Sequence, residues 1–154
     1  MRSFKKTINK LIKKNVTISV AESCTGGLLS SKLITEPGIS KIFNMGLVTY
    51  SNQSKSSLLK IPPYFIKKYG SVSYQTANKM AINLKKISKS QLNISTTGIA
   101  GPSGGTKSKS IGLVFIGIKF INKIIVLEKK FKGSRNQIQQ KTIITIFKEI
   151  EKLI

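Results

Sequence analysis

The chain has 154 residues, of which 40% are hydrophobic, and carries a formal net charge of +22 at pH 7. A chain of this length buries enough surface for a hydrophobic core, and we predict a single domain over residues 1–154. The sequence has no histidine, no aspartate and only one cysteine, which excludes a Ser-His-Asp triad, an internal disulfide and a zinc site built from the usual ligands.

The positive charge has two explanations that the sequence leaves open. Lysines are spread along the whole chain and accompany many Ile, Asn and Ser residues, a pattern typical of A/T-rich codons drifting into tolerant positions. A nucleic-acid-binding surface would instead gather basic residues in one block with aromatic residues between them. We therefore expect no specific nucleic-acid partner, with strongly salt-dependent DNA binding as the alternative.

Nothing in the chain predicts contact with a membrane. No apolar run approaches the roughly 20 residues that cross a bilayer, and the N-terminal stretch lacks the features of a signal peptide. Phe4, Ile8, Leu11 and Ile12 recur at helical spacing within residues 1–14, which indicates an amphipathic helix, with a mitochondrial-type presequence as the alternative. We expect a cytoplasmic protein with no membrane partner.

The remaining elements follow from hydrophobic periodicity and from helix-capping and turn residues. The first half of the chain predicts a buried strand at 16–21, a helix at 27–35 ended by Pro37-Gly38, a strand at 43–50, a helix at 51–59, and a helical turn from Pro62-Pro63 to Gly70. The second half predicts a helix at 73–87, a strand at 92–97, a loop at 98–105, a hairpin of 111–120 and 124–131 around Asn122, and a closing helix marked by Ile143, Ile146, Phe147, Ile150 and Leu153. This order is typical of a mixed α/β sandwich, with helices packed on a sheet that ends in an antiparallel hairpin.

Residues 22–27, Glu-Ser-Cys-Thr-Gly-Gly, lie between a predicted strand and a predicted helix. The N-terminus of a helix directs backbone N–H groups and a positive dipole at whatever occupies such a turn. A serine there can be presented to a substrate while nearby amides stabilise an oxyanion. The alternative is structural, because Ser or Thr before a helix is commonly an N-cap.

Residues 49–55, Thr-Tyr-Ser-Asn-Gln-Ser-Lys, form a second junction between a strand and a helix. Lys55 would lie about one turn into the helix, where the dipole disfavours a cation. A buried lysine there would have a lowered pKa and could accept a proton from a serine, with Tyr50 assisting. A solvated surface lysine is the alternative.

Residues 97–105, Thr-Gly-Ile-Ala-Gly-Pro-Ser-Gly-Gly, follow a third strand. Four glycines allow close approach of the backbone to a ligand, typically a phosphate or a sugar, although no phosphate-binding P-loop motif is present. A flexible surface loop is the alternative. All three segments follow the ends of strands, where open α/β sheets bind ligands.

Together these segments resemble the CinA C-terminal domain family. The resemblance covers residues 4–150 and rests above all on AESCTGG at 21–27 and TGIAGPSGG at 97–105, supported by Pro37-Gly38, TYSN at 49–52 with Lys55, Val72-Ser73 and Met80-Ala81. It implies a three-layer α/β/α sandwich, a homo-oligomer and the stand-alone form of the domain. It also implies a nicotinamide-nucleotide amidase, which hydrolyses the carboxamide of nicotinamide mononucleotide to nicotinate mononucleotide and ammonia in pyridine-nucleotide salvage.

The resemblance also implies roles for individual residues. Ser23 matches the nucleophile, Lys55 its general base and Tyr50 an assisting hydroxyl, with no metal and no cofactor. The expected substrate-binding residues, drawn from the three segments and from the start of the last helix, are Glu22, Thr25, Gly26, Gly27, Thr97, Gly98, Gly101, Gly104, Gly105 and Arg135. Two motifs depart from the family pattern, since Ser134 replaces an Asp before Arg135, and Lys-Pro-Val-Gly is altered to Lys109-Ser110-Ile111-Gly112.

The sequence leaves three further points open. Cys24 is the rival nucleophile to Ser23. The amides near Gly26 and Gly27 are expected to hold the oxyanion. The alternative function is a nucleotide-binding or partner-binding module that has kept the fold and lost turnover, motivated by Ser134 and Ser110.

Overall fold

The structure, a computed structural model, describes residues 2–154, with side chains from residue 4 onward. The five strands are β1 (Ile18–Glu22), β2 (Phe43–Val48), β3 (Leu92–Gly98), β4 (Leu113–Phe120) and β5 (Lys123–Lys130). The helices are α1 (Arg2–Lys13), α2 (Leu28–Ile34), α3 (Asn52–Leu59), α4 (Pro63–Tyr69), α5 (Tyr74–Ser88) and α6 (Arg135–Leu153), with a short 3-10 helix, η1 (Ile39–Lys41).

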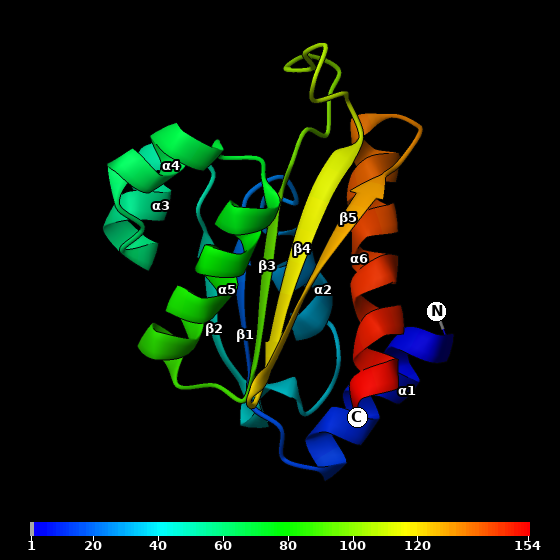
Figure 1. Ribbon diagram of the computed structural model, residues 1–154. Helices are drawn as coiled ribbons and strands as arrows, with labels where there is room; N and C mark the ends of the chain where they lie inside the picture. Colours follow the sequence, from blue (N-terminus) through cyan, green and yellow to red (C-terminus); the bar gives the residue numbers. More distant parts are fainter. Residues whose placement is uncertain (1) are drawn as a thin grey trace.

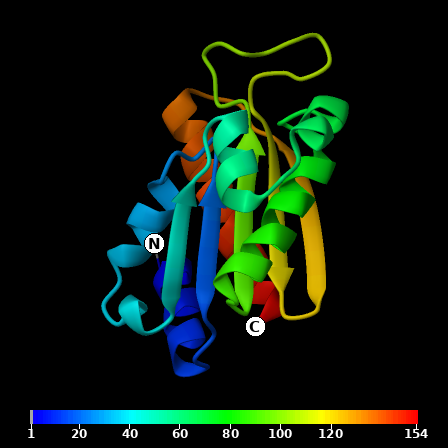
Figure 2. The same cartoon turned by 90° about the vertical axis from the view of Figure 1, so that its left-hand side faces the viewer.

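The strands form one mixed sheet in the order β2-β1-β3-β4-β5. β1 pairs in parallel with both β2 and β3, whereas the β3–β4 and β4–β5 pairs are antiparallel. Helices α3, α4 and α5 cover one face of the sheet, and α1, α2 and α6 cover the other (Figures 1 and 2). The predicted three-layer α/β/α sandwich, ending in an antiparallel hairpin, is confirmed.

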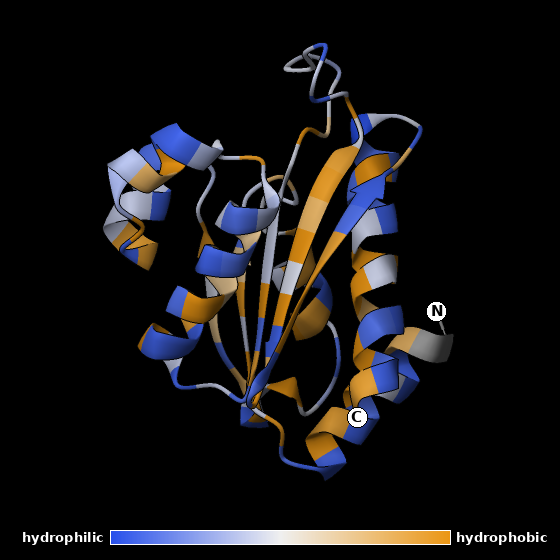
Figure 3. Cartoon of the chain, viewed as in Figure 1, coloured by the Kyte–Doolittle hydropathy of each residue, from blue (hydrophilic) through white to orange (hydrophobic). Residues whose placement is uncertain are grey.

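Burial follows from this layering. β1 is buried at every position and β3 and β4 at nearly every position, because helices cover both faces of these central strands. Figure 3 shows apolar residues along β4 and on the inward sides of the helices, with polar residues facing outward, whereas much of β3 is of intermediate hydropathy. The predicted amphipathic helix at the N-terminus is confirmed, since Ile8 and Leu11 of α1 are fully buried against the body; Met1 of the predicted range lies outside the described residues.

The ends of several elements differ from the sequence-based expectation; β1, for instance, begins at Ile18 and not at residue 16. α6 begins at Arg135, well before the apolar positions that mark it in the sequence. Its start is set by a capping box, in which Ser134 and Gln137 each accept a hydrogen bond from the other's backbone N–H. Strand β2 ends at Val48, two residues earlier than expected, and β4 begins at Leu113, two residues later. η1 has no counterpart in the prediction.

The parallel part of the sheet places the chemically interesting segments together. Glu22, the last residue of β1, is in register with Val48 of β2 and with Thr96 of β3. The segments that follow these strands therefore leave the same edge of the sheet side by side. The long loop between β3 and β4 and the start of α6 lie at this end of the molecule (Figure 1).

Candidate active site

Ser23 lies directly after the central strand β1. Its backbone N–H donates to the carbonyl of Thr96, at 3.0 Å, which extends the sheet pairing by one residue and fixes the base of the turn. Ser23 is 7% exposed, so its hydroxyl faces a restricted space. The turn continues through Gly26 and Gly27, both in the left-handed region, before α2 begins.

Lys55, in the helix that follows β2, contacts Ser23, which follows the neighbouring parallel strand β1. Lys55 Nζ lies 2.9 Å from Ser23 Oγ, 3.0 Å from the Thr49 carbonyl oxygen and 3.4 Å from that of Tyr50. The lysine is 1% exposed. Its position is set by the N-terminus of α3, where Ser51 and Ser54 form a capping box.

The environment of Lys55 favours a neutral amine. Burial lowers the pKa of Lys55, because an ammonium ion loses its hydration there. Within residues 4–154 no carboxylate lies within ion-pair distance of Nζ; the ion pairs are Lys6–Glu151 and Lys152–Glu149. Lys55 therefore has a larger neutral fraction at a given pH than a surface lysine, and it can act as a base.

Cys24 lies next to Ser23 but lacks the properties of a nucleophile. Its side chain is 5% exposed, and burial raises the pKa of Cys24 to about 12, despite an opposing hydrogen bond from Thr96. A cysteine attacks as the thiolate, which is almost absent at neutral pH when the pKa is this high. The raised pKa of Cys24, together with the contact that Lys55 makes with Ser23, thus favours Ser23 over Cys24.

Tyr50 contacts Lys55 through its main chain and not through its hydroxyl. The side chain is 61% exposed at the edge of the site, and its hydroxyl makes no hydrogen bond in the described part of the chain. The assisting role expected of the Tyr50 hydroxyl is therefore supported by no hydrogen bond within residues 4–154.

Glu22 is a structural carboxylate. It is fully buried, and its two oxygens accept hydrogen bonds from the backbone N–H groups of Gly27, Leu29 and Ser30 and from the Ser30 hydroxyl, at 2.7–3.1 Å. The carboxylate satisfies the first turn of α2, where the N-cap residue, Gly27, offers no side chain. A substrate contact by Glu22 would therefore be indirect, through the turn that it holds.

The amides expected to hold an oxyanion are already engaged. The Gly26 N–H donates to the Ser23 carbonyl, at 3.1 Å, and the Gly27 N–H donates to Glu22. The amide of Cys24, the residue after the nucleophile, donates to its own thiol but makes no hydrogen bond to another residue among residues 4–154. Oxyanion binding at this turn thus points to Cys24 and away from the two glycines.

A cavity of about 300 Å³ opens in front of Ser23 and Lys55. Its walls come from the Ser23 turn, the segment after β2, the segment before α5, the loop after β3 and the start of α6: Ser23, Cys24, Tyr50, Lys55, Ser71, Val72, Thr97, Gly98, Ile99, Ala100, Gly101, Ser103, Gly104 and Arg135. Eight of the expected site residues line this cavity. Glu22, Thr25, Gly26, Gly27 and Gly105 do not.

Thr25 lies behind the cavity wall, whereas Gly105 is exposed in the loop after β3. Thr25 is 1% exposed and its hydroxyl lies 2.8 Å from that of Thr96, which ties the turn to β3. Gly105 packs against Ile111, in the return of the loop. Gly98 does line the cavity, but a side chain there would meet the Leu113 carbonyl at 2.7 Å, so close strand packing also requires this glycine.

Sequence reasoning missed the segment of Ser71 and Val72 as a wall of the cavity. The Thr97 hydroxyl donates to the Ser71 carbonyl, at 2.6 Å, and fastens this segment to the end of β3. The only local signal is the N-cap at Ser73, which predicts the start of α5 and not its distance from Ser23.

The described residues lack two kinds of feature. No group of three His, Cys, Asp or Glu side chains there is close enough to hold a metal ion. Over the same residues, no helix has the length and apolar character needed to cross a membrane.

Comparison with known proteins assigns the chain to a family. A protein of Clostridium novyi named as competence-damage inducible is 48% identical over 134 residues, covering 87% of this chain and 32% of that protein. A CinA-like protein of Fusobacterium nucleatum is 47% identical over 141 residues, covering 92% of this chain and 34% of that one. The chain thus spans about a third of the length of these relatives.

The fold and the family model agree with these relatives. The crystal structure of a competence/damage inducible protein from Agrobacterium tumefaciens is similar with a TM-score of 0.92 and 31% identity, over 98% of this chain and 95% of that one. The model of the CinA C-terminal domain matches residues 2–154. The chain therefore belongs to the CinA C-terminal domain family.

Proposed function

We propose that the chain is a nicotinamide-nucleotide amidase that works with Ser23 as the nucleophile and Lys55 as the base. The reaction is hydrolysis of nicotinamide mononucleotide to nicotinate mononucleotide and ammonia. The observation that carries the proposal is the 2.9 Å contact between Lys55 Nζ and Ser23 Oγ at the wall of a cavity, with the lysine buried and without a carboxylate partner.

The contacts of Lys55 suit a neutral amine. A neutral amine has two N–H donors and one lone pair. The two donors can serve the carbonyls of Thr49 and Tyr50, which leaves the lone pair for the hydroxyl proton of Ser23. In the first step Lys55 takes that proton while Ser23 Oγ attacks the amide carbon.

The remaining steps return the proton and release the acid. The Cys24 N–H, next to the nucleophile, donates to the oxyanion of the tetrahedral intermediate. The Lys55 ammonium gives its proton to the amino group of the tetrahedral intermediate, the C–N bond breaks, ammonia departs, and an ester is left on Ser23. Water, deprotonated by Lys55, hydrolyses the ester to the carboxylate and restores the Ser23 hydroxyl.

The charge of the cavity is consistent with a nucleotide monophosphate. Its lining includes Arg135 and Lys55 and no carboxylate. Arg135 is exposed and makes no ion pair within residues 4–154, so its guanidinium is available to a phosphate. The glycine-rich loop after β3 borders the same space and would contact the substrate through its backbone.

The test is ammonia release from nicotinamide mononucleotide by the purified chain, with a metal chelator present throughout. We expect turnover in the wild type, none in Ser23→Ala, and retention within a few-fold in Cys24→Ser. Turnover that survives Ser23→Ala would refute the serine mechanism. A wild type that releases no ammonia would refute the amidase.

A second candidate function is a nucleotide-binding module without turnover. Ser134 favours it, because it replaces the family's Asp, and its hydroxyl caps α6 and makes no hydrogen bond to the Arg135 side chain within residues 4–154. Binding of nicotinamide mononucleotide without ammonia release, measured by calorimetry on the same preparation, would select this candidate.

A further inference from the structure

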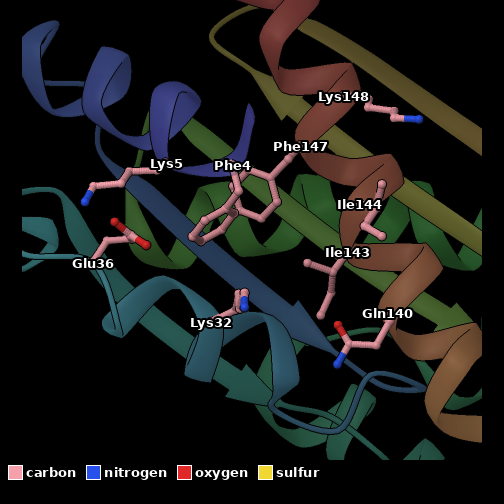
Figure 4. Close-up of a pocket in the computed structure, with 9 residues that line it drawn as sticks. All are labelled: Phe4, Lys5, Lys32, Glu36, Gln140, Ile143, Ile144, Phe147 and Lys148. Carbon is pink, nitrogen blue, oxygen red and sulfur yellow. The ribbon is translucent and has the colours of Figure 1, made fainter. Parts of the chain in front are cut away.

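A second cavity, of about 360 Å³, lies between α1, α2 and α6, on the face of the sheet opposite to α5 (Figure 4). It is lined by Phe4, Lys5, Lys32, Glu36, Gln140, Ile143, Ile144, Phe147 and Lys148. None of these residues lines the cavity in front of Ser23. The proposed amidase reaction therefore leaves this second cavity without a role.

One side of the cavity is apolar and rigid. The rings of Phe4 and Phe147 meet edge to face, with their centroids 4.4 Å apart, and tie α1 to α6. Ile143 is buried beside them, whereas Ile144 is 54% exposed although it lines the same hollow. A large aliphatic side chain that stays half-exposed in a concave apolar wall provides a surface for a ligand.

The other side of the cavity is polar and mainly cationic. Three lysines and one carboxylate line it, together with the Gln140 amide. Figure 4 shows Lys32 and Gln140 approaching the hollow near Phe4 and Ile143, whereas the amine of Lys148 points away from it. Lys32 Nζ lies over the ring of Phe4, 5.7 Å from its centroid, so a positive charge is held at the border of the apolar wall.

We propose that this cavity binds a small organic anion with an apolar body. Lys32 and Gln140 would hold the carboxylate, sulfonate or phosphate head, and Phe4, Phe147 and Ile144 would contact the body. The volume falls within the range of small-molecule sites. A second copy of the chain fits less well, because it would bring a protein of net charge +22 against this lysine-rich rim.

The test uses two probes of the same shape, naphthalene-2-sulfonate and the neutral naphthalene-2-methanol, titrated calorimetrically at physiological ionic strength. We expect the sulfonate to bind saturably with one site per chain, and about tenfold more tightly than the alcohol, which corresponds to one favourable charged contact. Inorganic sulfate should not displace it, because sulfate lacks the apolar body. The readout is binding, so the result does not depend on whether the chain is an amidase.

Two variants and two matched controls locate the site. Lys32→Glu should weaken sulfonate binding about tenfold or more, because an attraction becomes a repulsion, and Ile144→Gln should weaken both probes about threefold or more. Lys123→Glu, at the exposed first residue of β5, and Ile34→Gln, on α2 outside the cavity, should leave affinity unchanged. Melting temperatures of all four variants verify that they fold.

Three results would overturn the proposal. The first is an absence of saturable binding by the sulfonate at millimolar concentration. The second is equal affinity for the sulfonate and the alcohol, which would remove the role of the cations. The third is an equal loss of affinity in Lys32→Glu and Lys123→Glu, which would show that the sulfonate senses only the overall positive charge.

Discussion

The two junctions that meet at the candidate active site, β1–α2 and β2–α3, use their helix N-termini in opposite ways. At β1–α2 the first amides of the helix donate to the buried carboxylate of Glu22. The positive end of the α2 dipole therefore faces a side chain of the protein itself and not a substrate. At β2–α3 the hydroxyls of Ser51 and Ser54 cap the helix. No carboxylate is needed there, and the next residue, Lys55, reaches Ser23.

Glu22 and Lys55 are two buried ionisable residues, of which the first has a structural role and the second has the surroundings of a reactive group. Both are almost completely buried. Four donors satisfy Glu22, whereas Lys55 faces two carbonyls and a hydroxyl and lacks an ion pair in the described chain. A fully satisfied carboxylate rigidifies its surroundings, while an unpaired buried amine remains able to exchange a proton. Burial of a charge therefore does not by itself identify a catalytic group; its partners do.

The largest expected effect comes from Lys55→Met. Removing a general base should lower turnover by about 10²–10⁴-fold, whereas stability should be kept or raised, because a desolvated amine gives way to an apolar chain of similar length. Ammonia release and urea unfolding of the same preparation measure the two effects. Lys67→Met, at an exposed position on α4, is the control and should change neither. A loss of stability in Lys55→Met that matches the loss of activity would contradict the reactive role of this lysine.

Glu22→Ala should show the reverse pattern, with stability as the primary loss. The change leaves three backbone N–H groups and one hydroxyl without their acceptor, and each buried unsatisfied group costs about 1–3 kcal/mol, so we expect a loss of at least about 2 kcal/mol after relaxation. Glu22→Gln should lose less, since its amide keeps one acceptor oxygen. Urea unfolding checks the order, with the exposed Glu128→Ala as the control. An unfolding free energy equal to that of the wild type in Glu22→Ala would show that the cap is dispensable.

The pH dependence follows from the lowered pKa of Lys55. Activity should fall as pH drops through this pKa, because the base becomes protonated, and it should level off at higher pH. The unfolded chain binds a proton up to the ordinary lysine pKa of about 10.4. Between the two values the unfolded state therefore holds more protons, and this lysine makes stability rise with pH. Unfolding free energies of the wild type and Lys55→Met, measured at several pH values in that window, check this direction. The rise in stability with pH that Lys55 contributes should be absent from the variant.

The smallest effect is expected for Ser51→Ala. Loss of an exposed N-cap hydroxyl should cost about 1 kcal/mol, and turnover should fall several-fold, because the first turn of α3 positions Lys55. The matched change Ser134→Ala removes the N-cap of α6 and should cost similar stability without displacing Lys55. Thermal unfolding and turnover of the two variants are compared side by side. If both lose turnover equally, the cap of α3 has no special part in placing the lysine.

Much of the local structure could be predicted from the sequence. The central strands are short and rich in β-branched residues, and Ser51 and Ser73 lie where N-caps belong, so most of these elements appear within one or two residues of expectation. The start of α6 was not predicted from periodicity, because only Ile138 is apolar in its first two turns. The capping pair Ser134 and Gln137 was the available signal.

The sequence by itself determined which chemistries are closed: without histidine, aspartate or a second cysteine, a Ser-His-Asp triad, an internal disulfide and a zinc site of the usual ligands are excluded, and the resemblance to the family then implies Ser23 and Lys55. Only the tertiary structure decided that Lys55 lies 2.9 Å from Ser23, 32 residues away, that Glu22 serves α2, and that the amides of Gly26 and Gly27 are engaged. The reason is physical. Periodicity and capping act over a few residues, whereas these contacts depend on the strand order β2-β1-β3, which decides which strand ends become neighbours.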